Sequence, residues 1–92
     1  MIQNKSMKEL EKLLKAFANR RRLAIIKYLK SHKEASVSEV AYEISLSFKA
    51  TSKHLLVLLA VDIVEREQRN VQMFYQLANP QKSIVRQIIG VL

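Results

Sequence analysis

The stretch SVSEVAYEISLSFKATSKHLLVLL, residues 36–59, contains two short helical patterns with almost no room between them. Ser36 or Ser38 can accept hydrogen bonds from the free N–H groups at the start of the first helix. Its inward-facing residues are Val40, Ala41 and Ile44. The connection is too short for a long loop, so we expect Ser47 to cap a second helix at once. Two helices joined by such a tight turn indicate a helix-turn-helix, which we place at about residues 38–61.

Two amphipathic helices are expected before this stretch. Ser6 followed by Glu9 is a capping-box pattern, so the first helix is predicted at about residues 7–17. Its apolar stripe consists of Met7, Leu10, Leu13, Leu14 and Phe17. Asn19 can cap a second helix, which ends near residue 31 or 32. Its apolar face is broad, and by this pattern it is the most buried helix.

A β-hairpin is expected next, in IVEREQRNVQMFYQL, residues 63–77. β-Branched and aromatic residues lie at both ends, and Asn70 tolerates the positive φ that a tight hairpin turn requires. With Arg69 and Asn70 as the two turn residues, Val64 faces Tyr75, although a slip of one residue is compatible with the same sequence. We interpret this hairpin as a wing.

A last amphipathic helix is expected at about residues 80–92. Asn79-Pro80 can cap and open it, because proline is favoured at the first helical position. Its apolar stripe consists of Ile84, Val85, Ile88, Ile89 and Leu92. The predicted order is helix, helix, a short extended segment at Val37, helix, helix, two strands and helix. The sequence therefore predicts a single domain over residues 1–92, mainly α with a β-hairpin wing, a winged helix-turn-helix.

The charge of the chain favours a polyanionic partner. Its 92 residues include 16 Lys and Arg against 8 Asp and Glu, a formal net charge of +8. Nucleic acid is the first candidate, with an anionic membrane surface and plain surface charge as alternatives. The absence of cysteine excludes disulfides, thiolate metal sites and cysteine nucleophiles. No stretch has the length of a membrane span or of a signal-peptide core, so we expect a cytoplasmic protein without membrane contact.

Several segments together resemble the ArsR/SmtB family of bacterial and archaeal transcriptional repressors. The similarity covers about residues 10–79, and the spacing from Ser47 to His54-Leu55 is its most specific part. The segments are FANRRRLAIIKYL (17–29), residues 36–59, IVERE (63–67) and FYQL (74–77). The resemblance implies a winged helix-turn-helix repressor that binds double-stranded DNA, at a palindromic operator, as a homodimer.

The chain departs from the family at its metal sites. Metal-sensing members carry cysteines where this chain has Ser36 and Ser38, and others use a histidine on the last helix, which has none here. A hydroxyl is a poor ligand for soft metals, so we predict no thiol-type metal sensing and no cofactor. Asp62 and Asn70 replace glycines common in the family, and both types tolerate left-handed geometry. The sequence does not identify an effector.

The first two turns of the second helix of the helix-turn-helix carry the main candidates for DNA contact. Such turns present side chains to base edges and phosphates. The candidates are Ser47, Phe48, Lys49, Ser52 and Lys53. Phe48 either contacts a thymine methyl group or packs in the core, and the lysines either bind DNA or solvate the helix. His54 is a further candidate, as a phosphate contact or as a partly packed residue.

Basic and polar residues of the wing form a second group of candidates. A narrow minor groove attracts arginine, so a basic hairpin favours DNA contact over an ordinary solvated turn. The residues are Arg66, Arg69, Asn70 and Gln72. Arg22, which matches the family, begins the second helix, where the helix dipole disfavours positive charge. Either phosphate, an acidic neighbour or solvation is expected to offset that unfavourable position.

The terminal helices carry apolar faces that a domain of this size cannot easily cover alone. We expect them to pair across a two-fold axis, as they do in the family, the alternative being packing within one protomer. The dimer candidates are Leu10, Leu13, Phe17, Ile84, Ile88 and Leu92.

Family members often place charged residues where this chain has Leu56, Leu59 and Ala60. The two leucines are the unexpected residues. They are either covered by the terminal helices or they mark another contact. This leaves a second functional hypothesis, a winged-helix module that binds proteins and binds nucleic acid only non-specifically. An enzyme is not expected, because the sequence shows no nucleophile with a base, no phosphate-binding glycine loop and no carboxylate pair.

Overall fold

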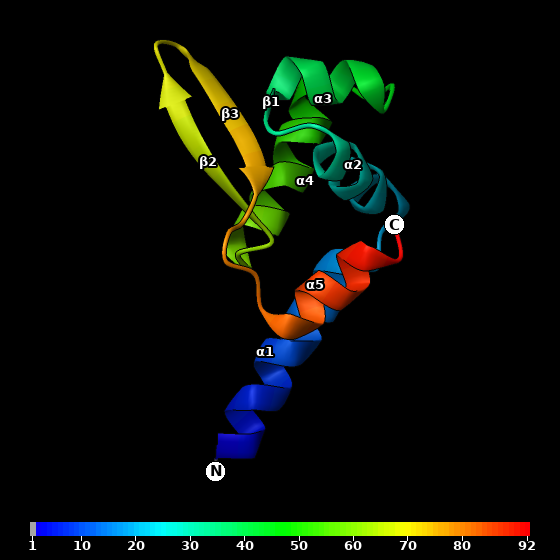
Figure 1. Ribbon diagram of the computed structural model, residues 1–92, viewed down its shortest axis with the longest axis vertical. Coiled ribbons are helices and arrows are strands. Elements are labelled where there is room, and N and C mark those ends of the chain that lie inside the picture. Colours follow the sequence, from blue (N-terminus) through cyan, green and yellow to red (C-terminus); the bar gives the residue numbers. More distant parts are fainter. Residues whose placement is uncertain (1) are drawn as a thin grey trace.

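The computed structural model describes the backbone of residues 2–92 and the side chains of residues 6–92. The elements follow the predicted order, so the mainly helical fold with a hairpin wing is confirmed. They are α1 (Ile2–Phe17), α2 (Arg20–Ser31), β1 (Ala35–Ser36), α3 (Val37–Glu43), α4 (Phe48–Ala60), β2 (Val64–Arg69), β3 (Gln72–Leu77) and α5 (Ser83–Gly90). α1 and α5 lie at the end of the molecule opposite α3 and the tip of the β2–β3 hairpin (Figure 1).

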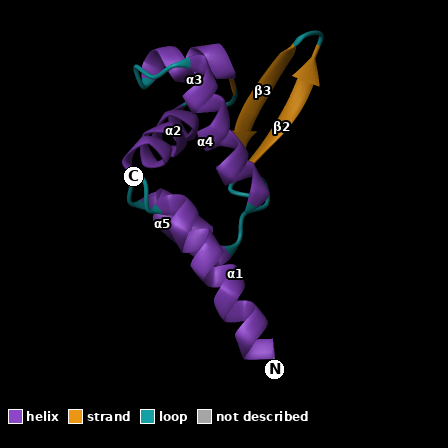
Figure 2. Ribbon diagram, turned by 180° about the vertical axis from the view of Figure 1, so that it is seen from behind, coloured by secondary structure: helices purple, strands orange, loops and turns teal. Residues whose placement is uncertain are grey.

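The core lies where α2, α3 and α4 meet the base of the wing (Figure 2). Its fully buried side chains come from all of these elements. They include Ile25, Ile26, Val40, Leu55, Leu58, Ile63, Val64 and Tyr75. Full burial of one such side chain contributes about 2 kcal/mol to the free energy of folding, so this cluster fixes how the helices and the wing are placed. Val85 and Ile89 join it from α5.

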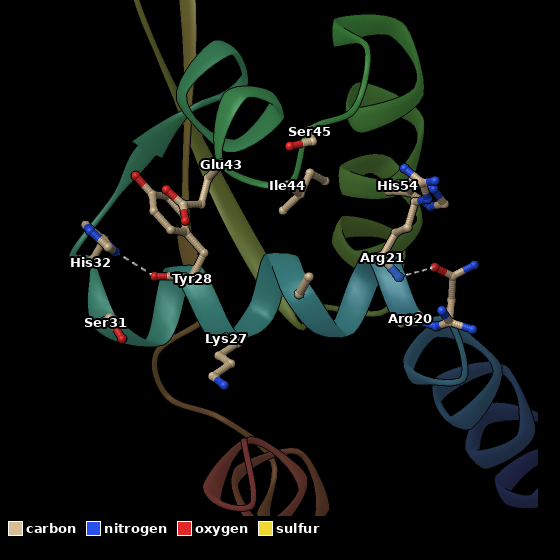
Figure 3. Close-up of a pocket in the computed structure, with 12 residues that line it drawn as sticks. Arg20, Arg21, Lys27, Tyr28, Ser31, His32, Glu43, Ile44, Ser45 and His54 are labelled. Atoms are coloured by element: carbon tan, nitrogen blue, oxygen red, sulfur yellow. Dashed lines mark hydrogen bonds between the residues drawn. The ribbon is translucent and has the colours of Figure 1, made fainter.

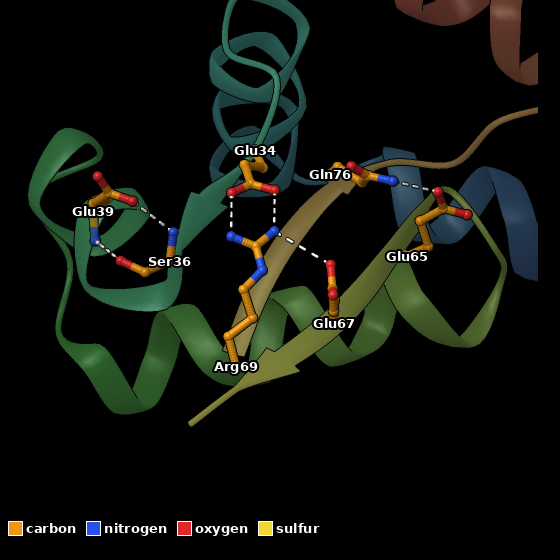
Figure 4. Close-up of polar contacts among 7 residues, drawn as sticks. All are labelled: Glu34, Ser36, Glu39, Glu65, Glu67, Arg69 and Gln76. Atoms are coloured by element: carbon orange, nitrogen blue, oxygen red, sulfur yellow. Dashed lines mark hydrogen bonds and ion pairs between the residues drawn. The ribbon is translucent and has the colours of Figure 1, made fainter. Parts of the chain in front are cut away.

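The starts of α2, α3 and α4 are all capped at residues that the sequence offers as caps. The side chain of Asn19 accepts hydrogen bonds from the backbone N–H groups of Arg21 and Arg22, at 3.0 and 3.1 Å. Ser36 and Glu39 form a reciprocal capping box at the start of α3 (Figure 4). Ser47 accepts from the backbone N–H of the third residue of α4 at 3.1 Å. Local hydrogen bonds therefore set the start of each helix.

The ends of the chain differ from the prediction. α1 begins at Ile2, so Ser6 lies inside the helix and does not cap it. No glycine or proline interrupts this segment, and the helix continues toward the N-terminus. α5 begins at Ser83, after a cap residue with no side-chain bond, and not at Asn79-Pro80. The buried Ala78 still donates its N–H to the carbonyl of Ile63 at 3.0 Å, which holds the chain to the sheet and delays the helix.

The wing hairpin turns one residue later than predicted. β2 and β3 pair from Val64 opposite Leu77 to Arg69 opposite Gln72, so Asn70 and Val71 form the turn. The predicted pairing of Val64 with Tyr75 is therefore wrong, and the hairpin takes a slip of one residue at its turn, which the sequence had left open. Asn70 takes a φ of 56° as the first of the two turn residues, and Val71 does not need a positive φ in this arrangement.

A third strand completes the sheet, in the order β1-β3-β2. β1 pairs with β3 through Ala35 opposite Tyr75 and Ser36 opposite Phe74, so the extended segment precedes Val37, which begins α3. Asp62 has a φ of 59°, which confirms that it can replace glycine before the first wing strand. None of the helices in the described residues has both the length and the apolar character needed to cross a membrane.

Candidate nucleic-acid interface

The orientation of α4 is fixed by three buried residues. Thr51, Leu55 and Leu58 are fully buried and lie on one face of the helix. The opposite face of its first two turns is therefore turned to solvent, with Lys49 and Lys53 exposed. This arrangement is the one a recognition helix needs, since its N-terminal turns must reach base edges without disturbing the core.

A groove separates the start of α4 from the wing. Its volume is about 260 Å³, and it brings together four of the residues predicted to contact DNA, namely Phe48, Ser52, Arg66 and Gln72. The start of α3 and the apolar residues Val71 and Met73 complete its walls. Phe48 is 59% exposed, so of the two roles considered for it, packing in the core does not apply.

The wing arginines are held by partners within the protein. Arg66 donates to the hydroxyl of the buried Tyr75, with 3.3 Å between the nitrogen and the oxygen. Arg69 forms a two-pronged ion pair with Glu34, one bond of which measures 2.6 Å, and a second ion pair with Glu67 at 3.3 Å (Figure 4). The Arg69 guanidinium also lies 4.5 Å from the centre of the Phe74 ring.

These contacts change the electrostatics of the wing. The hydrogen bond from Arg69, together with the charges of Arg69 and Lys33, lowers the pKa of Glu34, and the two carboxylates raise the pKa of Arg69. Arg69 therefore does not stand as a free cation at the tip of the wing. This pairing is not predictable from local sequence, because Glu34 lies before β1 and is far from Arg69 along the chain.

Arg22 joins three elements. Its guanidinium donates to the carbonyl of Ala16 at 2.7 Å and to that of Lys15 at 3.2 Å, and it lies 3.1 Å from Nδ1 of His54. The last carbonyls of α1 carry partial negative charge, which offsets the unfavourable position of Arg22 at the start of α2. In this structure Arg22 therefore links α1 and α2 to α4, and its side chain is not free for the phosphate contact predicted from the sequence.

His54 is partly buried in this linkage. Burial lowers the pKa of its imidazole, and the positive charges of Arg22 and Arg21 lower it further. A guanidinium only donates hydrogen bonds, so Nδ1 must accept and the ring is neutral. Of its two predicted roles, the structure places His54 in the partly packed one.

A wider basic groove lies on the other side of α4, between α2 and the turn that joins α3 to α4 (Figure 3). Its volume is about 1030 Å³, and Arg20, Arg21 and Lys27 bring positive charge to it, with Glu43 as an acidic residue on its wall. His32 stacks on Tyr28 at 4.0 Å and bonds to the backbone carbonyl of that residue at 2.9 Å. Within the described residues, no three His, Asp or Glu side chains gather as a metal site would require.

The predicted dimer residues fall into three groups. Leu13 and Phe17 are buried in the core of the protomer, so the structure corrects their assignment to a surface open to a partner. Leu10 and Ile84 are exposed. Ile88 and Leu92 are partly buried against the core.

Two further apolar residues of α1 are exposed, Met7 and Leu14, and neither is among the residues predicted to form the dimer interface. With Leu10 and Ala18 they line a shallow apolar depression of about 370 Å³. Leu59 packs on the core of its own protomer, whereas Leu56 is 45% exposed. Of Leu56 and Leu59, only Leu56 therefore remains a candidate for a contact outside the protomer.

Comparison with known proteins agrees with the fold. A family model described as a helix-turn-helix domain matches residues 17–67, more than half of the chain. Comparison of the sequence with curated proteins gave no match.

Solved structures of transcription regulators superpose over nearly the whole chain. Reduced HlyU from Vibrio cholerae is 33% identical, with a TM-score of 0.80, and the match covers 98% of this chain and 90% of HlyU. The transcriptional repressor PagR of Bacillus anthracis is 26% identical, with a TM-score of 0.77 and coverage of 96% and 97%.

A third structure, from Mycobacterium bovis, is described as a homodimeric winged helix-turn-helix DNA-binding domain and a possible ArsR-family regulator. It is 22% identical, with a TM-score of 0.83 and coverage of 97% of this chain and 79% of that one, a likeness of fold. The family model and the 33% identity to HlyU agree with the winged helix-turn-helix geometry of α4 and the wing. The chain belongs to the helix-turn-helix domain family and is a DNA-binding winged helix-turn-helix transcription regulator of the ArsR/SmtB type.

Proposed function

We propose that this regulator is a repressor that binds a palindromic operator as a homodimer, with one α4 in each of two successive major grooves. The observation that carries the proposal is the groove between the first turns of α4 and the wing, beside the exposed Lys49 and Lys53. These lysines supply charge for phosphates, and the groove side chains supply contacts to base edges. The match to PagR, which is described as a transcriptional repressor, supports repression as the mode of regulation.

Exposed apolar residues at the other end of the molecule support the homodimer. Met7, Leu10 and Leu14 on α1 and Ile84 on α5 remain uncovered in one protomer. A two-fold axis through this end leaves the α4–wing surface of each protomer free, because α1 and α5 lie at the end opposite α3 and the wing tip (Figure 1). The Mycobacterium bovis domain, described as homodimeric, has the same fold.

The protein acts in this proposal by binding DNA in the cytoplasm and not by catalysing a reaction, in line with the matched transcription regulators. A second candidate function is a winged-helix module that binds another protein. The exposed Leu56, next to Val57 of 40% exposure, favours it, because this apolar surface continues along α4 beyond the lysines.

Selection of bound duplexes from a randomised pool tests the main proposal. We expect one duplex with two related half-sites, bound with a Kd on the order of 10 nM or tighter at physiological salt. Binding that is weak and equal for the selected and a scrambled duplex would instead favour the interaction module.

Sedimentation of surface variants tests the oligomeric state. Leu10→Asp and Ile84→Asp are expected to shift the protein to a monomer and to weaken binding to the two-fold operator. Leu56→Asp is the matched control, since it places the same charge on an exposed leucine elsewhere. A monomeric wild type, or a dimer that only Leu56→Asp disrupts, would contradict this arrangement.

A further inference from the structure

Two apolar side chains are exposed on the surface where we place DNA. Phe48 on the first turn of α4 is 59% exposed, and Val71 at the tip of the wing is 95% exposed. Both line the groove between α4 and the wing, whose other residues there include Ser52, Arg66 and Gln72. A phenylalanine ring exposed on a surface that meets DNA needs an apolar contact from the partner, because it has no hydrogen-bonding group to offer.

The ring cannot turn into the core. Thr51 and Leu55 are fully buried, so the rotation of α4 about its axis is fixed by residues on the next turn. The cap bond of Ser47 to the third residue of the helix fixes the first turn as well. Phe48 is therefore held at the surface, one turn before Ser52, where a recognition helix meets base edges.

The chemistry of the major groove leaves one partner for such a ring. Base edges there display hydrogen-bond donors and acceptors, and in unmodified DNA the only apolar group is the C5-methyl of thymine. The minor groove, where wing tips lie, displays no methyl group. Phe48 on α4 is therefore placed to contact a thymine methyl group, and Val71 at the tip of the wing is not. We propose that Phe48 packs on a thymine methyl group and makes one thymine in each half-site a determinant of operator recognition. The inference rests on the proposed operator binding.

Replacement of thymine by deoxyuridine tests this, because it removes the methyl group and leaves the hydrogen-bonding edge unchanged. Each symmetric pair of thymines in the selected operator is replaced in turn, and Kd is measured by fluorescence anisotropy for wild type, Phe48→Ala and Val71→Ala. Replacement of one of these thymine pairs is expected to weaken wild-type binding by about fourfold per half-site, because the interface loses one buried methyl group in each half-site. In Phe48→Ala this sensitivity disappears, and in Val71→Ala it remains.

The outcomes distinguish failure of this inference from failure of the proposed operator binding. Operator binding with no position sensitive to uracil, or with equal sensitivity in Phe48→Ala, overturns the inference and leaves the function standing. Loss of sensitivity in Val71→Ala alone overturns it too. Failure to select any operator removes the function and the inference together.

5-Methylcytosine presents the same methyl group, and duplexes that carry it in place of cytosine form a second arm. A methyl effect confined to 5-methylcytosine overturns the assignment to thymine. Thermal unfolding of both alanine variants serves as the folding control, and no large change in Tm is expected, because both side chains are exposed.

Discussion

Nη1 of Arg22 lies 3.1 Å from Nδ1 of His54, so the start of α2 is bonded to the recognition helix. The same guanidinium holds the last carbonyls of α1, at Lys15 and Ala16. A helix proposed to carry the dimer interface and the helix proposed to enter DNA are thus joined through one side chain. The strength of this linkage depends on a neutral imidazole, because Nδ1 must accept the hydrogen bond.

The first prediction concerns pH. The pKa of His54 is lowered in the folded protein below the ordinary value of about 6.5, so the unfolded chain binds more protons as pH falls through that value. The stability contributed by the neutral ring is fully present above about pH 6.5 and decreases as pH falls toward the folded pKa. Urea unfolding at several pH values is expected to show a steeper loss for wild type than for His54→Gln, which keeps an acceptor but does not titrate. Equal slopes would exclude His54 as the cause.

Removal of the Arg22 side chain is the second prediction. Arg22→Ala leaves two carbonyls of α1 and Nδ1 of His54 without their donor, and we expect the free energy of unfolding to fall by about 2 kcal/mol. Arg21→Ala is the matched control, because Arg21 is an exposed neighbour whose loss should change stability by less than about 0.5 kcal/mol. Chemical denaturation measures both, and similar values for the two variants would contradict the linkage.

Glu34 supplies the third prediction. Glu34→Gln leaves Arg69 without its two-pronged partner, so the charge at the wing becomes available to phosphates. We expect tighter DNA binding and a dependence of log Kd on log salt that is steeper by about one unit. Glu11→Gln, which removes the same charge on α1, is the control for net charge alone. If both variants bind equally tightly, the contact between Glu34 and Arg69 does not restrain the wing.

The fourth prediction concerns a buried hydroxyl in the recognition helix. Oγ1 of Thr51 is buried without a hydrogen-bond partner among the described residues. Thr51→Val replaces it with a methyl group of similar size, so the free energy of unfolding is expected to rise by about 1 kcal/mol. Thr51→Ser keeps the hydroxyl and loses the methyl group, and it should destabilise the protein. A valine variant less stable than wild type would show that the hydroxyl is satisfied in solution.

The fifth prediction tests the charge of α4. Lys53→Ala is expected to weaken operator binding and to reduce the salt slope by about one unit, because one phosphate contact is lost. Lys12→Ala, an exposed lysine on α1, should leave both quantities unchanged. Anisotropy titrations at several salt concentrations give both values. Unchanged affinity and slope in Lys53→Ala would remove that lysine from the interface.

The sequence was sufficient for features that depend on neighbours along the chain. Asn19 and Ser47 cap their helices as predicted, and Ser36 is the cap among the two serines considered, since a cap bonds to residues two or three positions away. Asp62 and Asn70 adopt positive φ for the same local reason. The order of elements follows from these signals together with the apolar patterns, and the family follows from the resemblance of four segments of the sequence to its members.

Features that depend on distant partners were decided only by the tertiary structure. The hairpin register follows from the pairing of β2 with β3, in which Val64 lies opposite Leu77, and the late start of α5 follows from the bond between Ala78 and Ile63. The sequence predicts DNA contact for Arg22 from the family resemblance and for Arg69 from its place in a basic wing. Folding brings the α1 carbonyls and His54 to Arg22, and Glu34 to Arg69. A charged side chain binds whichever opposite group the fold places within reach, and the sequence shows the charge but not the group.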